Sequence, residues 1–201
     1  MEIHAPSHPL KSLKEFFGHI LVVTVGILIA LWFESTKEKF HERQVVREAR
    51  ENFRLDVQAN RQHLSKEKDS LAAVRRAIDL ALDDPAGITA ATRKQPLTPG
   101  FYFFRSTSWD AALSTGALGH MPPTEVFNYA DMRESVRSYS EIENAAIKAF
   151  FEFRALEALK NPSPAELERQ RELLLLLREY IGVLDHLADE LQDALDKLKS
   201  V

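Results

Sequence analysis

The stretch FFGHILVVTVGILIALWFESTKEKFHER, Phe16–Arg43, changes from apolar to densely charged within a few residues and decides the fold class. No Lys, Arg, Asp or Glu occurs from Phe16 to Phe33, and twelve of these eighteen residues are Phe, Ile, Leu or Val. Each such side chain favours insertion near the centre of a bilayer by about 0.3–0.6 kcal/mol. A helix of this length extends about 27 Å, which matches the hydrocarbon thickness of a bilayer. The stretch therefore predicts a transmembrane helix over residues 16–33, preceded by an N-terminal tail of residues 1–15.

Two alternatives to a permanent anchor are a cleaved export signal and a central helix of a soluble bundle. An export signal has about 7–15 apolar residues followed by small residues at the cleavage site. Here the apolar stretch ends in Leu31, Trp32, Phe33 and Glu34, none of which is small. A soluble core helix of this length rarely lacks a polar face. We therefore expect the span to be retained, with the lipid bilayer as a partner.

The charges around the span leave its direction open. Lys11 and Lys14 precede the span, and five cations follow it: Lys37, Lys39, Arg43, Arg47 and Arg50. Counting Lys and Arg places the C-terminal side in the cytoplasm, because the more basic flank is usually cytoplasmic. The later cations alternate with glutamates, which neutralise them at helical spacing.

The segment KEFFGHILVVTVGILIALWFE, residues 14–34, and the segment Thr107-Ser-Trp109-Asp-Ala-Ala-Leu113-Ser-Thr-Gly116-Ala-Leu118 carry a resemblance. They resemble the "VVIGILIAL" span and the "TW..L..SG.L" element of a family of uncharacterised bacterial single-pass inner-membrane proteins. The juncture Trp32-Phe33-Glu34-Ser35 departs from the Asn/Trp/Glu-rich pattern of that family. The resemblance implies a helical domain in the periplasm, an N-terminus in the cytoplasm and no known activity.

The composition limits the classes of function. The chain has 201 residues, a net charge of −4 and no cysteine. The net negative charge argues against a nucleic-acid surface, which normally shows a concentrated basic face. The lack of cysteine removes disulfides, thiol catalysis and cysteine-ligated metals. The residues after the span are numerous enough for one domain with its own core.

Heptad spacing predicts that residues 34–201 form a helical bundle. One series is Arg50, Val57, Leu64, Leu71 and Ile78, and a second is Val46, Phe53, Asn60, Glu67, Val74 and Ala81. A 3/4 spacing of apolar residues continues from Val136 to Phe153. The last helix repeats leucines at 177, 184, 191 and 198, with Leu173, Tyr180, Leu187 and Ala194 at the other heptad position. We expect an all-α fold in which the transmembrane helix continues into an antiparallel bundle of three long helices and one short helix.

Proline and glycine mark the breaks between these helices. Residues 84–105 contain three prolines and two glycines and predict a long loop, whose apolar end should pack back onto the helices. Thr107 is the expected N-cap of a short helix at 108–115 that stops before Gly116. Ser163, with Pro164 and Glu166 after it, predicts a capping box at the start of the last helix.

Few side chains suggest catalytic or metal chemistry. Glu38 and His41 have the E-x-x-H spacing of di-iron bundles, but the sequence has no second copy of the motif. His63, His120 and His186 lie on separate predicted elements. His186, beside Asp185, needs a nucleophile such as Ser106 or Ser108 nearby to form a catalytic triad. We therefore expect no catalytic residues, no cofactor and no metal site.

Two surfaces could instead contact other molecules. Gly26 and Ala30 form a small-xxx-small pair in the span, which would let another transmembrane helix approach closely. Trp109, Asp110, Gly116 and Met121 surround the predicted short helix and could form a patch for a partner or a ligand. The alternatives are lipid-facing small residues for the first pair and a core position for Trp109.

These features predict a non-enzymatic, membrane-anchored helical accessory or scaffold protein that contacts a membrane-protein partner or another copy of itself. One alternative is an extracytoplasmic bundle that senses a small molecule and acts through a partner, because helical bundles bind ligands between their helices. A membrane-bound hydrolase is the third possibility, supported only by scattered Ser, His and Asp. The expected location is the bacterial inner membrane, with the bundle in the periplasm.

Overall fold

The computed structural model describes residues 13–84 and 87–198. All regular elements within these ranges are helices: α1 (Leu13–Asp83), α2 (Ile88–Lys94), α3 (Thr107–Ser114), the 3-10 helix η1 (Ala117–His120), α4 (Pro123–Glu157) and α5 (Pro164–Lys197). The predicted all-α class is thus confirmed for the described part of the chain. Residues 1–12, which make up most of the predicted tail, lie outside it.

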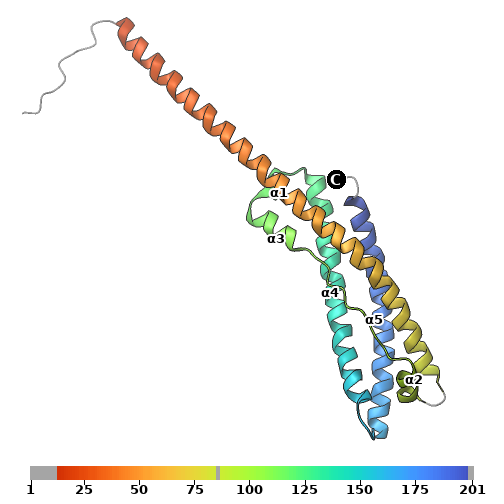
Figure 1. The fold of residues 1–201 in the computed structure, drawn as a ribbon. Helices are drawn as coiled ribbons and strands as arrows, with labels where there is room; N and C mark the ends of the chain where they lie inside the picture. Colours follow the sequence, from red (N-terminus) through yellow and green to blue (C-terminus); the bar gives the residue numbers. More distant parts are fainter. Residues whose placement is uncertain (1–12, 85–86, 199–201) are drawn as a thin grey trace, which may run out of the picture. The chain divides into compact units, whose positions relative to one another are not determined.

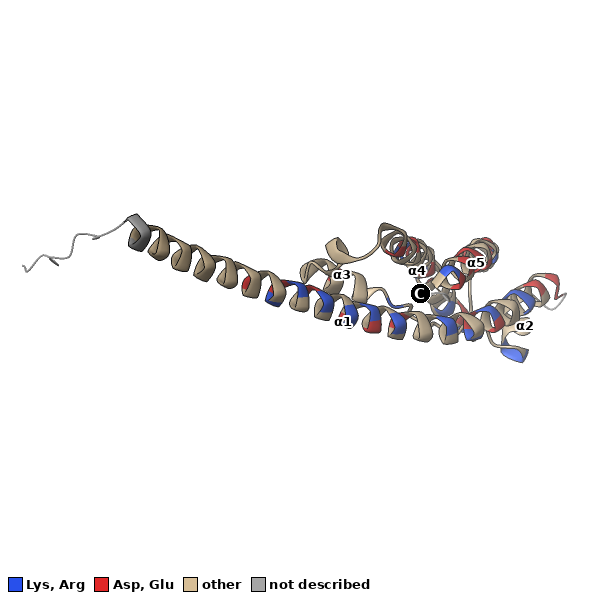
Figure 2. Cartoon of the chain, turned by 90° about the horizontal axis from the view of Figure 1, so that it is seen from above, with Lys and Arg blue, Asp and Glu red and all other residues tan. Residues whose placement is uncertain are grey.

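The chain divides into two compact units, one up to Val45 and one from Val46 onward. In the first unit, α1 is the one helix of the described residues that is long and apolar enough to cross a membrane. The side chains of residues 16–33 are exposed, and Trp32 and Phe33 at the end of this apolar segment are each 66% exposed. In Figure 2 the apolar segment of α1 is tan throughout. The acidic and basic residues, red and blue, begin where this segment ends.

In the second unit, the predicted heptad positions of α1 form one side of the core. Every member of the two predicted series except Arg50 is buried, including the polar residues Asn60 and Glu67. In the last helix, Tyr180 and Leu187 of the second predicted series are only half-buried. The four predicted leucines at 177, 184, 191 and 198 are buried, as are Leu173 and Ala194. The prediction of which helix faces form the core is therefore confirmed for these positions.

Ion pairs and hydrogen bonds align α1 antiparallel to α5. A cation recurs every seven residues along α1 and meets the opposite helix in reverse order: Arg61 Nη2 to the Leu195 carbonyl at 2.6 Å, Lys68 Nζ to Asp189 Oδ1 at 2.7 Å, and Arg75 Nη1 to Asp185 Oδ2 at 3.3 Å. Pairs of this kind between exposed groups contribute little energy, but they record the register of the two helices.

Helices α1 and α4 run parallel to each other in the bundle (Figure 1). Arg50 pairs with Glu125 near the start of α4, and Glu67 pairs with Tyr139 farther along both helices. The closely packed helices α4 and α5 are antiparallel. The predicted antiparallel arrangement therefore does not describe α1 and α4, because the chain between them returns along the bundle in extended form.

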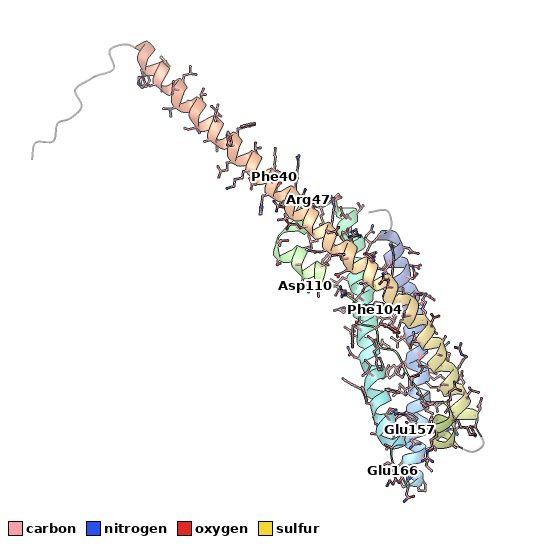
Figure 3. All side chains as sticks on the ribbon, in the orientation of Figure 1. Phe40, Arg47, Phe104, Asp110, Glu157 and Glu166 are labelled. Carbon is pink, nitrogen blue, oxygen red and sulfur yellow. The ribbon has the colours of Figure 1, made fainter. Side chains whose placement is uncertain are left out.

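The helix ends show where local sequence signals were sufficient to predict the start or end of a helix. Ser163 and Glu166 form the predicted capping box, with Glu166 Oε2 accepting from the Ser163 N–H at 2.6 Å. Glu157 and Glu166 mark the end of the bundle where α4 turns into α5 (Figure 3). The short helix begins one residue earlier than predicted, with Ser106 as its N-cap and no side-chain bond from that residue. The prediction of a loop at 84–105 is wrong in part, because α2 occupies the first half of this range.

Candidate functional site: the strap and the buried carboxylate cavity

Residues 96–106 form an extended segment between α2 and α3, which we call the strap. Its apolar end packs onto the helices, as predicted: Phe104 is 9% exposed and its ring lies 4.9 Å from the ring of Tyr139. Phe101 contacts Phe150 of α4 at 6.1 Å between ring centroids, whereas Phe103 is 69% exposed. Figure 3 shows Phe104 on the strap beside the helices of the bundle.

Three side chains of α1 bond to the backbone of the strap. They compensate for the hydrogen bonds that an extended segment outside a sheet cannot make with a neighbouring strand. Asn60 is the central contact, since its amide accepts from the Arg105 N–H at 2.7 Å and donates to the Arg105 carbonyl at 2.8 Å. The Phe103 carbonyl lies 3.0 Å from His63 Nδ1, which requires the proton on that nitrogen. The Gly100 N–H donates to Ser70 Oγ at 2.8 Å.

Gly100 leaves room for the Tyr102 ring of the strap and for Ser70 of α1. A Cβ at this position would lie 2.8 Å from the Tyr102 ring and 3.2 Å from Ser70 Oγ. The contact with the ring is shorter than side-chain packing tolerates, so any other residue would displace the strap or the ring. The absence of a side chain at residue 100 therefore allows the Gly100–Ser70 hydrogen bond.

The start of α3 is capped by a side chain from α1. Asp56 is buried, and its Oδ2 accepts from the Ser108 N–H at 3.1 Å and from the Ser108 hydroxyl at 2.6 Å. A carboxylate in this place satisfies a free N–H of the first helical turn, which the local N-cap residue leaves open. Asp56 thus does for α3 what Thr107 was expected to do, and it connects α3 to α1.

A cavity of about 40 Å³ lies beneath the strap, between α1, α4 and α5. Its polar corner consists of Glu67 and Ser70 of α1 and Glu143 of α4. The remaining wall is mainly apolar, and the strap contributes Pro99, Gly100 and Phe101 to it. The other lining residues are Leu71, Val74, Leu97, Ala146, Phe150, Leu177, Ile181 and Leu184.

Glu67 is held in this cavity by Tyr139. The Tyr139 hydroxyl donates to Glu67 Oε1 at 2.9 Å, while Glu67 Oε2 is buried and has no hydrogen-bond partner among the described residues. Burial raises the pKa of Glu67 to about 7, the nearby Glu143 also raises this pKa, and the Tyr139 hydrogen bond opposes the rise. Burial likewise raises the pKa of the Tyr139 phenol, so the phenol remains a donor at neutral pH.

Glu143 approaches the same cavity from α4. The Tyr102 N–H of the strap bonds to its carboxylate, and burial raises the pKa of Glu143 to about 6 despite that bond. Its Oε1 is also buried without a partner among the described residues. Two acidic residues, one from each of two helices, thus lie beside the cavity, and each has one enclosed oxygen without a partner among the described residues.

An open groove of about 1010 Å³ lies at the end of the bundle where α5 finishes, opposite the turn between α4 and α5. Arg47, Arg50, Arg54 and Arg61 line it, together with Glu48, Glu51, Gln58, Gln62, Val57, Tyr129 and Leu198. Most of these charges are already engaged. Arg50 makes two 2.8 Å bonds to Glu125, and Arg54 bonds twice to Glu51.

The structure brings only part of the predicted Trp109 patch together. Arg133 of α4 lies 5.8 Å from the Trp109 ring centroid and 3.7 Å from Asp110 Oδ1, so it joins these two residues to the bundle. Gly116 is exposed and has a φ of 73°, which explains glycine at the turn after α3. Met121 is 6% exposed and belongs to the core, so it does not contribute a surface to the patch.

The other side chains considered in the sequence lie apart from one another. The Ser108 hydroxyl donates to Asp56. His186 Nε2 lies 3.4 Å from Glu190 Oε1, so within the described residues the contacts of Ser108 and His186 do not form a triad. No group of three or more His, Cys, Asp or Glu residues in the described ranges could hold a metal ion. Gly26 and Ala30 are exposed, and a Cβ at Gly26 would meet no atom within 4 Å.

The carboxylate cavity was not predicted, although its residues left a signal in the sequence. Asn60 and Glu67 occupy heptad positions that face a core, where an unpaired polar side chain is costly. Glu143 likewise falls within the apolar stripe of α4, between Tyr139 and Ala146. Polar residues at core positions on two different helices indicate a buried polar contact, but they do not identify its partners.

Neither a scan of protein-family models nor searches of curated proteins and solved structures found a match to this chain.

Proposed function

We propose that the protein is a non-enzymatic, membrane-anchored helical accessory or scaffold protein that holds its bundle at a membrane and contacts another protein. The observation that carries this proposal is the uncharged helical segment at 16–33, whose exposed apolar side chains are suited to lipid and unsuited to water. The bundle has its own core and needs no contribution from that segment.

Two measurements test the anchor and the partner separately. The full chain should remain in the membrane pellet after carbonate washing, and the mature protein should retain residues 16–33. Purification in mild detergent should then recover a defined second protein or a homo-oligomer. A carbonate-soluble chain beginning near Glu34 would refute the anchor, and a detergent-solubilised monomer with no companion would refute the scaffold function.

For the orientation we propose a cytoplasmic N-terminus and a bundle in the periplasm of a bacterial cell. The sequence resemblance supports this direction, and the Lys and Arg count opposes it. An alkaline phosphatase fused after the C-terminus should therefore be active. An inactive phosphatase fusion, together with an active cytoplasmic reporter at the same position, would reverse the assignment.

The surface of α3 is our proposed partner contact. Asp110 has a 72% exposed side chain, and Leu113 one turn later is 61% exposed, so both are accessible although Trp109 is packed beneath Arg133. A photo-crosslinking residue at position 113 should capture the partner. The same residue at position 175, an exposed leucine on α5, is the matched control. Equal capture at both positions would remove α3 from the interface.

The cavity between the helices favours one second function, a bundle that senses a small ligand and acts through its partner. The specific observation is the pair of buried acidic residues, Glu67 and Glu143, that line this preformed and mainly apolar cavity. Ligand sites in helical bundles are formed in this way, by facing side chains of different helices. In this function the scaffold contact would transmit the bound state of the cavity.

A further inference from the structure

Five cations of α1 recur at seven-residue intervals: Arg47, Arg54, Arg61, Lys68 and Arg75. The last three of them bond to α5 in reverse order, to the Leu195 carbonyl, Asp189 and Asp185. Seven residues make nearly two full turns, so side chains at this spacing stay on one face of a helix. The first two cations therefore continue the face of α1 that binds α5.

Helix α5 ends before it reaches these first two cations. Arg61 already bonds near the end of α5, which finishes at Lys197 with Leu198 as its C-cap. Arg54 and Arg47 lie one and two heptads before Arg61, about 10 and 20 Å farther along the axis of α1. Residues 199–201 carry no acidic side chain. The side chains of α5 therefore do not pair with Arg54 or Arg47 as they pair with the later cations of the series.

The open groove of about 1010 Å³ lies where α5 ends. Its lining includes three cations of the series, Arg47, Arg54 and Arg61, and the side chains of Val57, Tyr129 and Leu198. Farther along α1, α5 packs against the same combination of cations and apolar side chains, since Lys68 pairs with Asp189 while Leu71 is buried. The groove thus has the chemistry of the α1–α5 contact beyond the end of α5.

Two arginines of the groove are available to an acidic partner. Arg47 is exposed and has no hydrogen bond or ion pair within the described part of the chain. Arg54 bonds to Glu51 three residues earlier, and both side chains are more than half exposed, so this pair contributes little and can be exchanged. Four arginines and two glutamates line the groove, so positive charge is in excess even when Glu125, the partner of Arg50, is counted.

We propose that this groove binds a helical segment of a partner protein that carries two acidic side chains seven residues apart. Such side chains lie about 10 Å apart on one face of a helix, which is the spacing of Arg47 and Arg54 on α1. The two acids pair with these arginines, and apolar side chains between them contact Val57 and Tyr129. The proposal rests on the scaffold function and adds a second contact to the surface of α3.

A labelled peptide of residues 177–197 is a suitable probe. It contains Asp189, which pairs with Lys68 in the bundle, and Asp196 seven residues later. Fluorescence anisotropy with the full-length protein in detergent should show saturable binding that weakens as sodium chloride increases from about 50 to about 300 mM. The peptide with Asp189→Asn and Asp196→Asn should bind about threefold to tenfold more weakly, because two exposed ion pairs are lost. No saturable binding, or equal binding of the two peptides, would overturn the proposal.

Two double variants of the protein connect the binding to the groove. Arg47→Gln/Arg54→Gln should weaken binding of the unmodified peptide by the same factor. The matched control Arg76→Gln/Arg171→Gln removes the same charge from two exposed positions that do not line the groove, and it should bind like the wild type. Equal affinity of the two double variants would place the peptide elsewhere and overturn the proposal.

Other occupants of the groove would give different results. Displacement of the peptide by phosphatidylglycerol but not by phosphatidylcholine would assign the groove to an anionic lipid. A protein dimer that excludes the peptide and dissociates in Arg47→Gln/Arg54→Gln would assign it to a second copy of the chain. Either result would overturn the proposal. Co-purification tests the scaffold function separately: a companion recovered without peptide binding refutes the groove alone, and peptide binding without a companion or an oligomer refutes the scaffold function alone.

Discussion

The hydroxyl of Tyr139 donates a 2.9 Å hydrogen bond to Oε1 of Glu67, and this contact joins α4 to α1 inside the core. Tyr139 is 0% exposed and Glu67 is 2% exposed. The bond satisfies a phenol and one carboxyl oxygen at once, in a place where an unpaired polar group would be costly. Because burial raises the pKa of Glu67 against the effect of this bond, the stability of the bundle depends on the protonation state of Glu67.

The bundle should lose stability as the pH rises from about 4.5 to above 7. Burial raises the pKa of Glu67 to about 7 and that of Glu143 to about 6, from 4.5. The folded chain therefore binds these protons more tightly than the unfolded chain, so the stabilisation is complete below pH 4.5 and is lost as each folded-state pKa is passed. Urea unfolding across this range should show a decrease of the order of 3 kcal/mol. The double variant Glu67→Gln/Glu143→Gln should show a flatter profile, and an unchanged slope in that variant would contradict the assignment.

Tyr139→Phe should destabilise the bundle more at pH 8 than at pH 5. The substitution retains the ring that packs on Phe104 but removes the donor from Glu67, which costs about 1–3 kcal/mol when the carboxyl group is ionised. It should also raise the pKa of Glu67 further, because the lost bond favoured the charged form. Chemical denaturation at the two pH values measures this difference. A loss of equal size at both would mean that the hydroxyl has only a packing role.

Asn60→Ala should release the strap from α1. The change leaves the N–H and carbonyl of Arg105 without their partners and should lower the free energy of unfolding by about 2–4 kcal/mol. Amide hydrogen exchange in residues 100–106 should become faster than in α5. Gln58→Ala, an exposed change on the same helix, provides the control and should leave strap exchange unaltered. Normal protection of the strap in the Asn60 variant would show that its apolar contacts alone hold it.

Leu184→Ala should cost about 2–5 kcal/mol, because it removes a buried side chain and enlarges the adjoining cavity. Leu184 is 3% exposed and lines that cavity, whereas Leu176 on the same helix is 40% exposed. Leu176→Ala should therefore change the free energy of unfolding much less. Urea unfolding of the two variants decides between a core and a surface role, and equal losses would place the core of α5 elsewhere.

Gly26→Leu should separate association from folding. A leucine in the apolar segment is compatible with lipid, and no atom of the chain lies within 4 Å of the added Cβ, so the bundle should keep its stability. If Gly26 and Ala30 pack against another helix, the larger side chain should weaken that contact. Cross-linking in native membranes measures this helix contact, with Gly26→Leu compared to the wild type at equal amounts of protein. Unchanged cross-linking would remove this face from the proposed interface.

Local sequence was sufficient where one helix determines the outcome. The apolar segment, the capping box at Ser163 and the buried heptad positions of α1 and α5 follow from composition, spacing and cap chemistry within single segments. Each depends on residues within a few turns of one another, so the pattern contains the information needed to predict it. Gly116 at the left-handed turn after α3 belongs to the same class.

Tertiary structure decided what depends on contacts between distant segments. Asp56 caps α3 from α1, Asn60 binds the strap, and Glu67 meets Tyr139 and Glu143, all across sequence separations of more than 40 residues. Heptad spacing placed Asn60 and Glu67 at the core but could not identify the groups that satisfy them there. A helical pattern specifies which face is buried, whereas hydrogen bonding requires a particular atom from another element at a particular place. The strap supplies those atoms for Asn60, whereas α4 supplies one for Glu67 and α3 supplies them for Asp56. The return of the strap along the bundle also makes α4 run parallel to α1.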